Sequence, residues 1–154
     1  MVFITGCNGL IGSFVARKFV NEGIKVCALK RKESNLSLLS DIVDKIEWIE
    51  GDILDISILE QAIQKADIVI HGAAIVSFSP KHRKNMFKIN IEGTANIVNT
   101  CLKYNIKTLC HISSIAALGR KKDDSVIDET AIWKDSEYNS AYAQSKYLSE
   151  LEVW

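Results

Sequence analysis

A tyrosine and a lysine stand four residues apart near the end of the chain, in the stretch "NSAYAQSKYLSE". Side chains at positions i and i+4 share one face of an α-helix, so a helix here places the Tyr142 phenol beside the Lys146 ammonium. A neighbouring positive charge stabilises the phenolate, which makes the tyrosine a better proton donor near neutral pH. Taken alone, the pair also fits two unrelated surface residues, so its meaning depends on the rest of the chain.

A second group of residues that could do chemistry opens the chain, in the stretch "TGCNGLIG". It joins an apolar run to a segment of helical period, which is the context in which spaced glycines bind a dinucleotide. Gly6 permits a tight turn, Gly9 lets the backbone approach a pyrophosphate, and Gly12 lets helix and strand pack closely. The start of the helix offers free N–H groups and a positive dipole end to phosphates. Ordinary turn glycines are the alternative.

The end of the second apolar run bears on which dinucleotide is bound. Sites that prefer NAD usually carry an acidic side chain there for the ribose 2′-hydroxyl. Here the sequence reads "ALKRKES", with three basic residues before Glu33. The planar guanidinium of Arg31 can hold a 2′-phosphate through paired hydrogen bonds, which favours NADP over NAD. A solvated basic strand end is the alternative.

Short apolar runs alternate with segments of helical period along the whole chain. Near-continuous apolar strands between helices indicate a parallel sheet covered on both faces. Right-handed crossovers then give an α/β doubly wound Rossmann-type fold with strand order 3-2-1-4-5. The predicted strands are 2–6, 25–29, 46–50, 67–74 and 107–114, and the predicted helices are 10–23, 55–66, 81–104 and 140 onward.

Two further features of the pattern concern particular segments. The long irregular stretch 119–139 is typical of a lid or a binding segment. In the first helix, one side collects the apolar residues Leu10, Ile11, Phe14, Val15 and Phe19.

The composition excludes several classes of protein. The 154 residues are enough for one domain with a real core, and 19 basic side chains balance 19 acidic ones, so the charge favours neither a nucleic-acid nor a membrane partner. No apolar run approaches the roughly 18 residues of a membrane span. The four cysteines show no CxxC spacing and no histidine stands at ligand spacing with them, which indicates reduced thiols in a cytoplasmic protein and no metal site.

Six short motifs are spread along the chain: "TGxxGxxG" at 5–12, "GDILD" at 51–55, "HGAA" at 71–74, "NIEGTANIV" at 90–98, "HISSIAALG" at 111–119 and "YAQSK" at 142–146. Their order and spacing resemble the extended short-chain dehydrogenase/reductase family, of the NAD-dependent epimerase/dehydratase type. The last two motifs are most similar to the branch that contains dihydroflavonol 4-reductase-like and 3β-hydroxysteroid dehydrogenase-like proteins. The resemblance implies a dinucleotide-binding domain over residues 1–154.

The resemblance implies catalytic roles for four positions. Tyr142 would be the general acid/base that exchanges a proton with a carbonyl or alcohol oxygen, and Lys146 would lower its pKa and hold the nicotinamide ribose. Ser114, the second serine of "ISS", would hydrogen-bond the reacting oxygen, with Ser113 as the alternative. Asn90 either supports the active-site lysine or a bound water, or it packs or caps its helix.

The resemblance also implies a nicotinamide dinucleotide cofactor, NADP with NAD as the alternative. Asp52 and Ile53 would contact the adenine. Ala73 and Ala74 would form a backbone bed for the cofactor, and Arg31 would meet the 2′-phosphate. The remaining cofactor-binding positions are the glycine turn and the catalytic pair: Thr5, Gly6, Asn8, Gly9, Leu10, Ile11, Gly12, Tyr142 and Lys146.

The activity implied is an NADP(H)-dependent oxidoreductase that transfers a hydride to or from a small carbonyl or secondary alcohol. Two alternatives stay open: a nucleotide-sugar epimerase or dehydratase with bound NAD, and a non-catalytic dinucleotide-binding fragment. Members of the resembled family are longer and add strands and a substrate lobe, so we expect this chain to be incomplete at its C-terminus and to lack the substrate domain. A homodimer paired through the long helices is expected by analogy.

Overall fold

The computed structural model describes residues 1–120 and 126–154, which form two compact units. The first unit comprises Met1–Ala73 and Asn96–Ile112, and the second comprises Ala74–Ala95 and Ser113–Trp154. Of the irregular stretch predicted at 119–139, residues 121–125 lie outside the described residues, and 126–139 contain neither helix nor strand.

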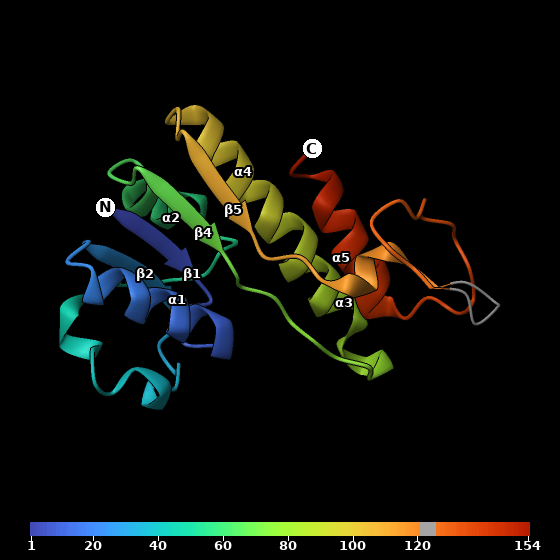
Figure 1. Cartoon of the computed structure of the whole chain (residues 1–154), viewed down its shortest axis with the longest axis horizontal. Coiled ribbons are helices and arrows are strands. Elements are labelled where there is room, and N and C mark those ends of the chain that lie inside the picture. The colour runs from blue at the N-terminus through green and yellow to red at the C-terminus, as the bar shows by residue number, and fades with distance from the viewer. Residues whose placement is uncertain (121–125) are drawn as a thin grey trace. The chain divides into compact units, whose positions relative to one another are not determined.

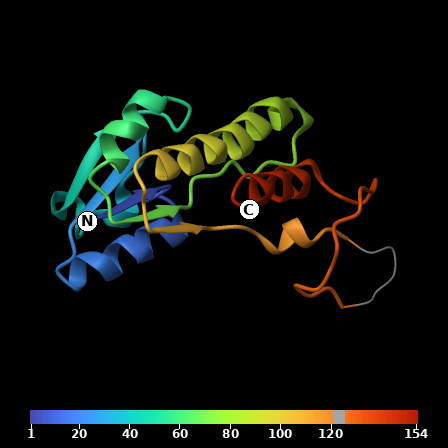
Figure 2. The same cartoon turned by 90° about the horizontal axis from the view of Figure 1, so that it is seen from above.

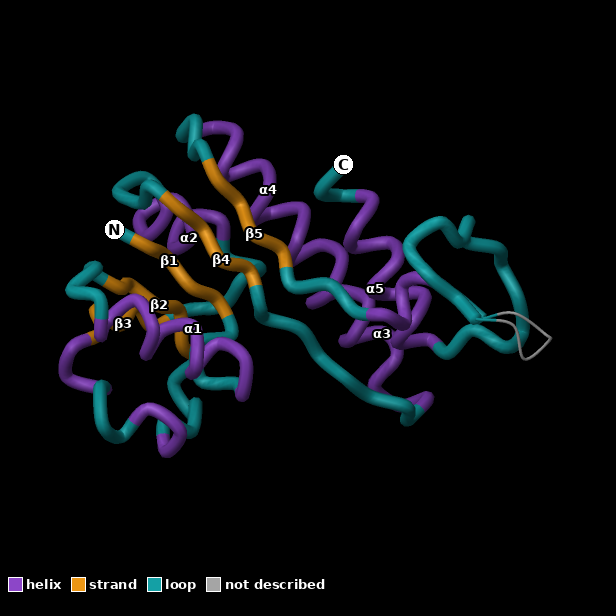
Figure 3. The backbone as a smooth tube through the Cα atoms, viewed as in Figure 1, coloured by secondary structure: helices purple, strands orange, loops and turns teal. Residues whose placement is uncertain are grey.

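The first unit is built on a five-stranded sheet in the order β3-β2-β1-β4-β5 (Figures 1 and 3). Every neighbouring pair of strands is parallel, so all the carboxyl ends lie at one edge of the sheet. This confirms the predicted α/β doubly wound Rossmann-type sheet and its strand order. The strands are β1 (Val2–Thr5), β2 (Val26–Lys30), β3 (Ile46–Glu50), β4 (Ile68–His71) and β5 (Thr108–His111).

Helices cover both faces of this sheet (Figure 2). Helix α1 (Leu10–Asn21) lies on one face, and α2 (Ile56–Ile63) lies on the other, together with the part of α4 (Gly93–Lys103) that belongs to the first unit. The central strand β1 is buried at every position, as a strand covered on both faces must be. Helix α2 begins where predicted because the Asp55 carboxylate accepts hydrogen bonds from the N–H groups of Ser57 and Ile58.

The apolar side predicted for α1 is only partly buried. Leu10, Ile11 and Phe14 are 68%, 57% and 64% exposed. Val15 and Phe19 of this side do pack against the core, partly buried, but the fully buried residues of α1 are the small Gly12, Ser13 and Ala16. A Cβ on Gly12 would already collide with the β1 turn, so no large side chain fits there. Close helix–strand packing therefore overrides the apolar periodicity in the first turns of this helix.

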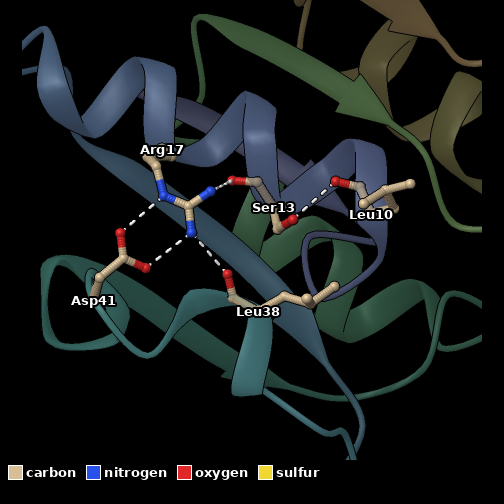
Figure 4. Close-up of polar contacts among 5 residues, drawn as sticks. All are labelled: Leu10, Ser13, Arg17, Leu38 and Asp41. Carbon is tan, nitrogen blue, oxygen red and sulfur yellow. Dashed lines mark hydrogen bonds and ion pairs between the residues drawn. The ribbon is translucent and has the colours of Figure 1, made fainter.

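An arginine fastens the connection between β2 and β3 to α1 (Figure 4). Arg17 donates two hydrogen bonds of 2.8 Å to the Asp41 carboxylate and one of 2.8 Å to the Leu38 carbonyl. The connection is otherwise held by two short 3₁₀ turns, Ser37–Leu39 and Val43–Lys45. Because Arg17 lies two turns along the helix from the glycine turn, this fork fixes the chain that follows β2 relative to α1.

The second unit is helical, and α5 (Ala141–Leu151) is its longest regular element. Helix α5 packs against α3 (Arg83–Phe87), against a π-helical turn at Lys88–Glu92 and against a 3₁₀ turn at Ile115–Leu118. The single helix predicted at 81–104 is therefore a run of 3₁₀ (Pro80–His82), α, π and α segments. Among the described residues, no helix combines the length and apolar character that crossing a membrane would require.

The cysteines are free thiols, as predicted, but they differ in exposure. Cys7, Cys27 and Cys101 are buried, and burial raises the pKa of the Cys7 thiol to about 12. Cys110 is exposed on β5. Within the described ranges, no group of three or more His, Cys, Asp or Glu side chains is placed to hold a metal ion.

Candidate active site

The glycine turn of the first unit brings two backbone segments into close approach. Gly6 has φ +70°, and a Cβ built on it would lie 2.6 Å from the Gly72 carbonyl carbon. A Cβ on Gly12 would lie 2.2 Å from the Gly6 carbonyl oxygen. Gly9 is the N-cap of α1, and no described side chain caps this helix end. The first turn of α1 is therefore open to a phosphate through backbone N–H groups alone.

A cavity of about 280 Å³ lies against this turn, within the first unit. Thr5 stands at its base, where its hydroxyl accepts a hydrogen bond from the Ala73 N–H at 3.3 Å and pairs with His71 Nδ1 at 2.7 Å. A bare backbone loop beside an apolar cavity fits a dinucleotide phosphate and its neighbouring groups. The lining comprises Ile4, Thr5, Gly6, Gly9, Leu10, Ile11, Gly12, Val15, Ile70, Gly72 and Ile112.

The basic residues after β2 differ in how they are engaged. Lys30 forms an ion pair with Glu50 at 3.2 Å, across the ends of β2 and β3. Arg31 is exposed, and its side chain has no hydrogen bond or ion pair with any residue of the described ranges. Its backbone N–H donates to the Ser34 hydroxyl at 3.0 Å, which shapes the turn. The guanidinium of Arg31 is thus available to an anion at the strand end.

The other predicted cofactor positions of the first unit are held by local hydrogen bonds. Asp52 accepts from the Leu54 N–H at 2.9 Å, and the Ile53 carbonyl accepts from the Asn96 side chain at 3.2 Å. The Asn8 amide donates to the Asn35 carbonyl at 3.4 Å, which ties the glycine turn to the β2–β3 connection. The first unit thus contains every predicted cofactor position except Ala74, Tyr142 and Lys146, which belong to the second unit.

The predicted tyrosine and lysine both lie on α5 of the second unit. The Lys146 side chain is almost completely buried, with 2% exposure, whereas Tyr142 is half-buried. Burial lowers the pKa of the Lys146 ammonium below its ordinary value, and the nearby Glu150 carboxylate opposes this effect. A lysine held inside the fold at this spacing is not the solvated surface residue of the simpler interpretation.

Asn90 lies on the π-helical turn and is buried to 1% exposure. Its Oδ1 accepts from the Ile75 N–H at 2.7 Å, while its Nδ2 donates to the Ile75 carbonyl at 3.0 Å and to the Ser145 hydroxyl at 2.9 Å. The Ser145 hydroxyl in turn donates to the Tyr142 carbonyl at 2.8 Å. Asn90 therefore joins the segment after β4 to the turn of α5 that carries the tyrosine and the lysine.

The two candidate serines follow β5 and have different surroundings. The Ser114 hydroxyl accepts from the Ala116 N–H at 3.2 Å and caps the 3₁₀ turn. Its own proton stays available to another acceptor. The Ser113 hydroxyl oxygen is buried and has no hydrogen-bond partner in the described part of the chain. Of the two, Ser114 caps an element that packs against α5.

In the second unit, Tyr142 and Lys146 lie on α5, and two elements that pack against α5 carry the other candidates: Asn90 lies on the π-helical turn, and Ser114 caps the 3₁₀ turn. Sequence reasoning missed Ser145, although this serine stands inside "YAQSK", because a serine one residue before the lysine has no signal of its own. It also missed Phe78, whose ring meets the Tyr142 ring edge-on with centroids 6.3 Å apart.

The sequence profile of the NAD dependent epimerase/dehydratase family matches residues 2–154. The chain belongs to this family. The match confirms the resemblance drawn from the six motifs. The close backbone approaches at Gly6 and Gly12 form a cradle of the kind that a dinucleotide pyrophosphate fits.

Relatives and solved structures agree with the family. A Synechocystis protein with the name "Putative dihydroflavonol 4-reductase" is 34% identical over 151 residues, which are 98% of this chain and 43% of the relative. A short-chain dehydrogenase/reductase superfamily protein from Agrobacterium tumefaciens with bound NAD is 25% identical at a TM-score of 0.83, covering 99% of this chain and 44% of that one. The Bordetella bronchiseptica enzyme WbmH in complex with NAD⁺ is 28% identical at a TM-score of 0.83, with coverages of 99% and 50%.

The chain therefore spans between 43% and 50% of the length of these relatives. The bound NAD in two of the structures agrees with a nicotinamide dinucleotide as the cofactor of this family.

Proposed function

We propose that this chain provides the cofactor-binding and proton-transfer groups of an oxidoreductase that transfers a hydride to or from a carbonyl or secondary alcohol. The observation that carries the proposal is the Tyr142–Lys146 pair on α5, with the lysine buried and the helix packed against the turn that Ser114 caps. In a pair of unrelated surface residues the lysine would remain in water, because burying its ammonium costs free energy.

In the direction of reduction, the Tyr142 hydroxyl would donate its proton to the carbonyl oxygen of the substrate. The Ser114 hydroxyl, whose oxygen already accepts from Ala116, would donate a second hydrogen bond to the same oxygen. The Lys146 ammonium would stabilise the phenolate that Tyr142 leaves behind. When bound, the nicotinamide supplies the hydride to the carbonyl carbon, or accepts it in the reverse direction.

Asn90 would act as a positioning residue in this reaction. It touches neither partner of the proton transfer, but its amide holds Ser145, and Ser145 holds the Tyr142 carbonyl. Through this chain of hydrogen bonds, Asn90 would fix the rotation of α5 that presents the phenol. The alternative interpretation, in which Asn90 only packs or caps its helix, does not need the two hydrogen bonds to Ile75.

Reduction of a panel of carbonyl compounds, followed through the absorbance of the reduced nicotinamide, tests the proposal. Tyr142→Phe should lower kcat/KM by at least about 100-fold, because the general acid is lost. The matched control is Tyr138→Phe, which removes a hydroxyl from a tyrosine that lies outside α5. Equal rates for Tyr142→Phe and the unmodified protein would remove Tyr142 from the mechanism.

The choice of NADP over NAD is a finer part of the proposal. It is supported by the exposed Arg31 guanidinium and by the absence of an acidic residue at 30–32. Titration calorimetry with NADPH and NADH measures the preference. Arg31→Ala should weaken NADPH binding about tenfold and leave NADH binding unchanged, whereas Lys25→Ala, which removes an exposed basic side chain at the opposite end of β2, should change neither. Tighter binding of NADH to the unmodified protein would overturn the preference.

An epimerase or dehydratase is the second candidate, because the family name and the NAD-bound relatives point to it. Such an enzyme retains its dinucleotide through the cycle, so NAD should stay with the purified protein and a nucleotide sugar should be converted without net consumption of cofactor. Mass spectrometry of the extracted nucleotide and product analysis with a nucleotide sugar decide between the two candidates.

A homodimer is the partner arrangement that we propose for the full protein. Leu102 on α4 and Leu151 on α5 are 70% and 53% exposed, and exposed apolar side chains on helices are available to a second copy. Light scattering measures the mass directly. Leu102→Lys should shift a dimer toward monomer, and a monomer before substitution would contradict the arrangement.

A further inference from the structure

Phe78 is an exposed aromatic residue placed against the tyrosine of the proposed reaction. Its side chain is 78% exposed, yet its ring meets the Tyr142 ring at an interplanar angle of 67°, with centroids 6.3 Å apart. Edge-to-face pairs of this kind are favourable, so the contact favours this relative orientation of the two rings. The exposed part of the Phe78 ring can pack against another apolar group.

The segment that carries Phe78 is held on both sides of it. On one side, Asn90 makes hydrogen bonds to both backbone groups of Ile75. On the other side, the Ser77 hydroxyl pairs with His82 Nδ1 at 3.0 Å and accepts from the Ser79 N–H at 3.2 Å. These bonds engage the Ser77 hydroxyl and hold the backbone on both sides of Phe78.

The segments that carry Phe78 and Ser114 expose further apolar side chains. Val76 is 62% exposed, and Ile115, the residue after Ser114, is 89% exposed. The stretch "AIVSFS" at 74–79 contains no charged side chain. Arg83, at the start of α3, is engaged with the Gln144 side chain at 3.0 Å and with the Phe87 ring at 4.7 Å.

We propose that Phe78 is a specificity-determining residue that contacts the substrate and selects carbonyl compounds bearing a flat apolar group next to the carbonyl. The inference rests on the proposed function, because it places the carbonyl oxygen at the Tyr142 hydroxyl. An aromatic or conjugated ring attached to that carbonyl then packs on Phe78. A sugar ring, whose hydroxyl groups need hydrogen-bond partners, gains less from this surface.

Two aldehydes that differ in whether the ring is flat and conjugated test this inference, each variant being compared with the unmodified protein on the same aldehyde. Benzaldehyde and cyclohexanecarbaldehyde have the same carbon skeleton, and kcat and KM for both are measured with the reduced cofactor. Phe78→Leu should raise KM for benzaldehyde about three- to tenfold with kcat nearly unchanged, and should alter cyclohexanecarbaldehyde less than twofold. Phe14→Leu, which shortens another exposed phenylalanine without a ring contact to Tyr142, is the control.

The outcomes separate the two proposals. A Tyr142-dependent reduction in which Phe78→Leu affects both aldehydes equally overturns the role of Phe78 and leaves the proposed function standing. Binding is measured independently by saturation-transfer NMR with benzyl alcohol and cyclohexylmethanol. Benzyl alcohol binding that depends on Phe78, without any turnover, overturns the proposed function and supports the aromatic contact. If neither turnover nor Phe78-dependent binding is observed, both proposals are overturned.

Discussion

Replacing Asn90 by alanine removes three hydrogen bonds from the interior of the second unit at once. The bonds run to the Ile75 N–H, the Ile75 carbonyl and the Ser145 hydroxyl, at 2.7, 3.0 and 2.9 Å. Each bond contributes about 1 kcal/mol net to stability, so Asn90→Ala should lower the free energy of unfolding by about 3 kcal/mol. For a chain of this length, that corresponds to a fall in Tm of about 6 to 12 °C.

Two asparagines further along the same helical run provide matched controls. The Asn96 amide makes one hydrogen bond, of 3.2 Å to the Ile53 carbonyl, and Asn99 is exposed. Asn96→Ala should therefore cost about 1 kcal/mol, and Asn99→Ala should be close to neutral. The three substitutions remove the same side chain, so differences among them report the hydrogen bonds and the burial of each asparagine.

Urea unfolding followed by far-UV circular dichroism measures the series, with the same m-value required of all four proteins. The expected order of stability is Asn99→Ala, then Asn96→Ala, then Asn90→Ala. If Asn90→Ala were as stable as Asn99→Ala, the hydrogen bonds between the segment after β4 and α5 would contribute nothing to the free energy of unfolding. That result would contradict the positioning role of Asn90.

Three other substitutions test separate parts of the structure. Gly12→Ala should destabilise the protein and abolish dinucleotide binding, because its Cβ would lie 2.2 Å from the Gly6 carbonyl oxygen; calorimetry with the cofactor measures this, and unchanged affinity would contradict the close approach. Lys146→Met should stabilise the protein at neutral pH, since burial lowers the lysine pKa in the folded state. The gain should shrink as pH rises through that lowered pKa toward the ordinary value of 10.5, and a gain independent of pH would exclude the lysine as its source. Asp41→Asn should be less stable than the unmodified protein at neutral pH, because the Arg17 guanidinium lowers the pKa of the Asp41 carboxyl to about 2. That difference in stability should vanish as pH falls through about 2, because the Asp41 carboxyl is then protonated in both the folded and the unfolded protein. A difference that persists in strong acid would refute the ion pair.

The sequence predicted the parts of the fold that depend on periodicity and chain direction. Apolar strands separated by helices allow few topologies once crossovers are right-handed, which is why the strand order 3-2-1-4-5 was predictable. The glycine turn was predictable for a related reason. Gly6 and Gly12 stand where a side chain would collide with backbone, and no other residue type fits there.

Features that depend on contacts between distant residues were not predictable in the same way. The π-helical turn at 88–92 was not predictable from the apolar pattern of 81–104. Asn90 on this turn makes hydrogen bonds to Ile75 and Ser145, and such contacts between distant residues do not appear in the periodicity. The exposure of Leu10 and Phe14 follows from close packing at Gly12, which periodicity does not contain. The sequence left Ser113 and Ser114 as alternatives. The structure distinguishes their hydroxyl groups, because that of Ser114 accepts from the Ala116 N–H, whereas that of Ser113 is buried without a partner among the described residues.

The most direct test of the proposed chemistry follows one hydrogen isotope. The protein is given NADPH in which both hydrogens at C4 of the nicotinamide are deuterium, together with an aldehyde, and the alcohol formed is analysed by mass spectrometry. Transfer of one deuterium to the carbinol carbon by the unmodified protein, lost in Tyr142→Phe and kept in Tyr138→Phe, is the predicted result. Alcohol without deuterium, or labelled alcohol formed equally well without the Tyr142 hydroxyl, would contradict the account.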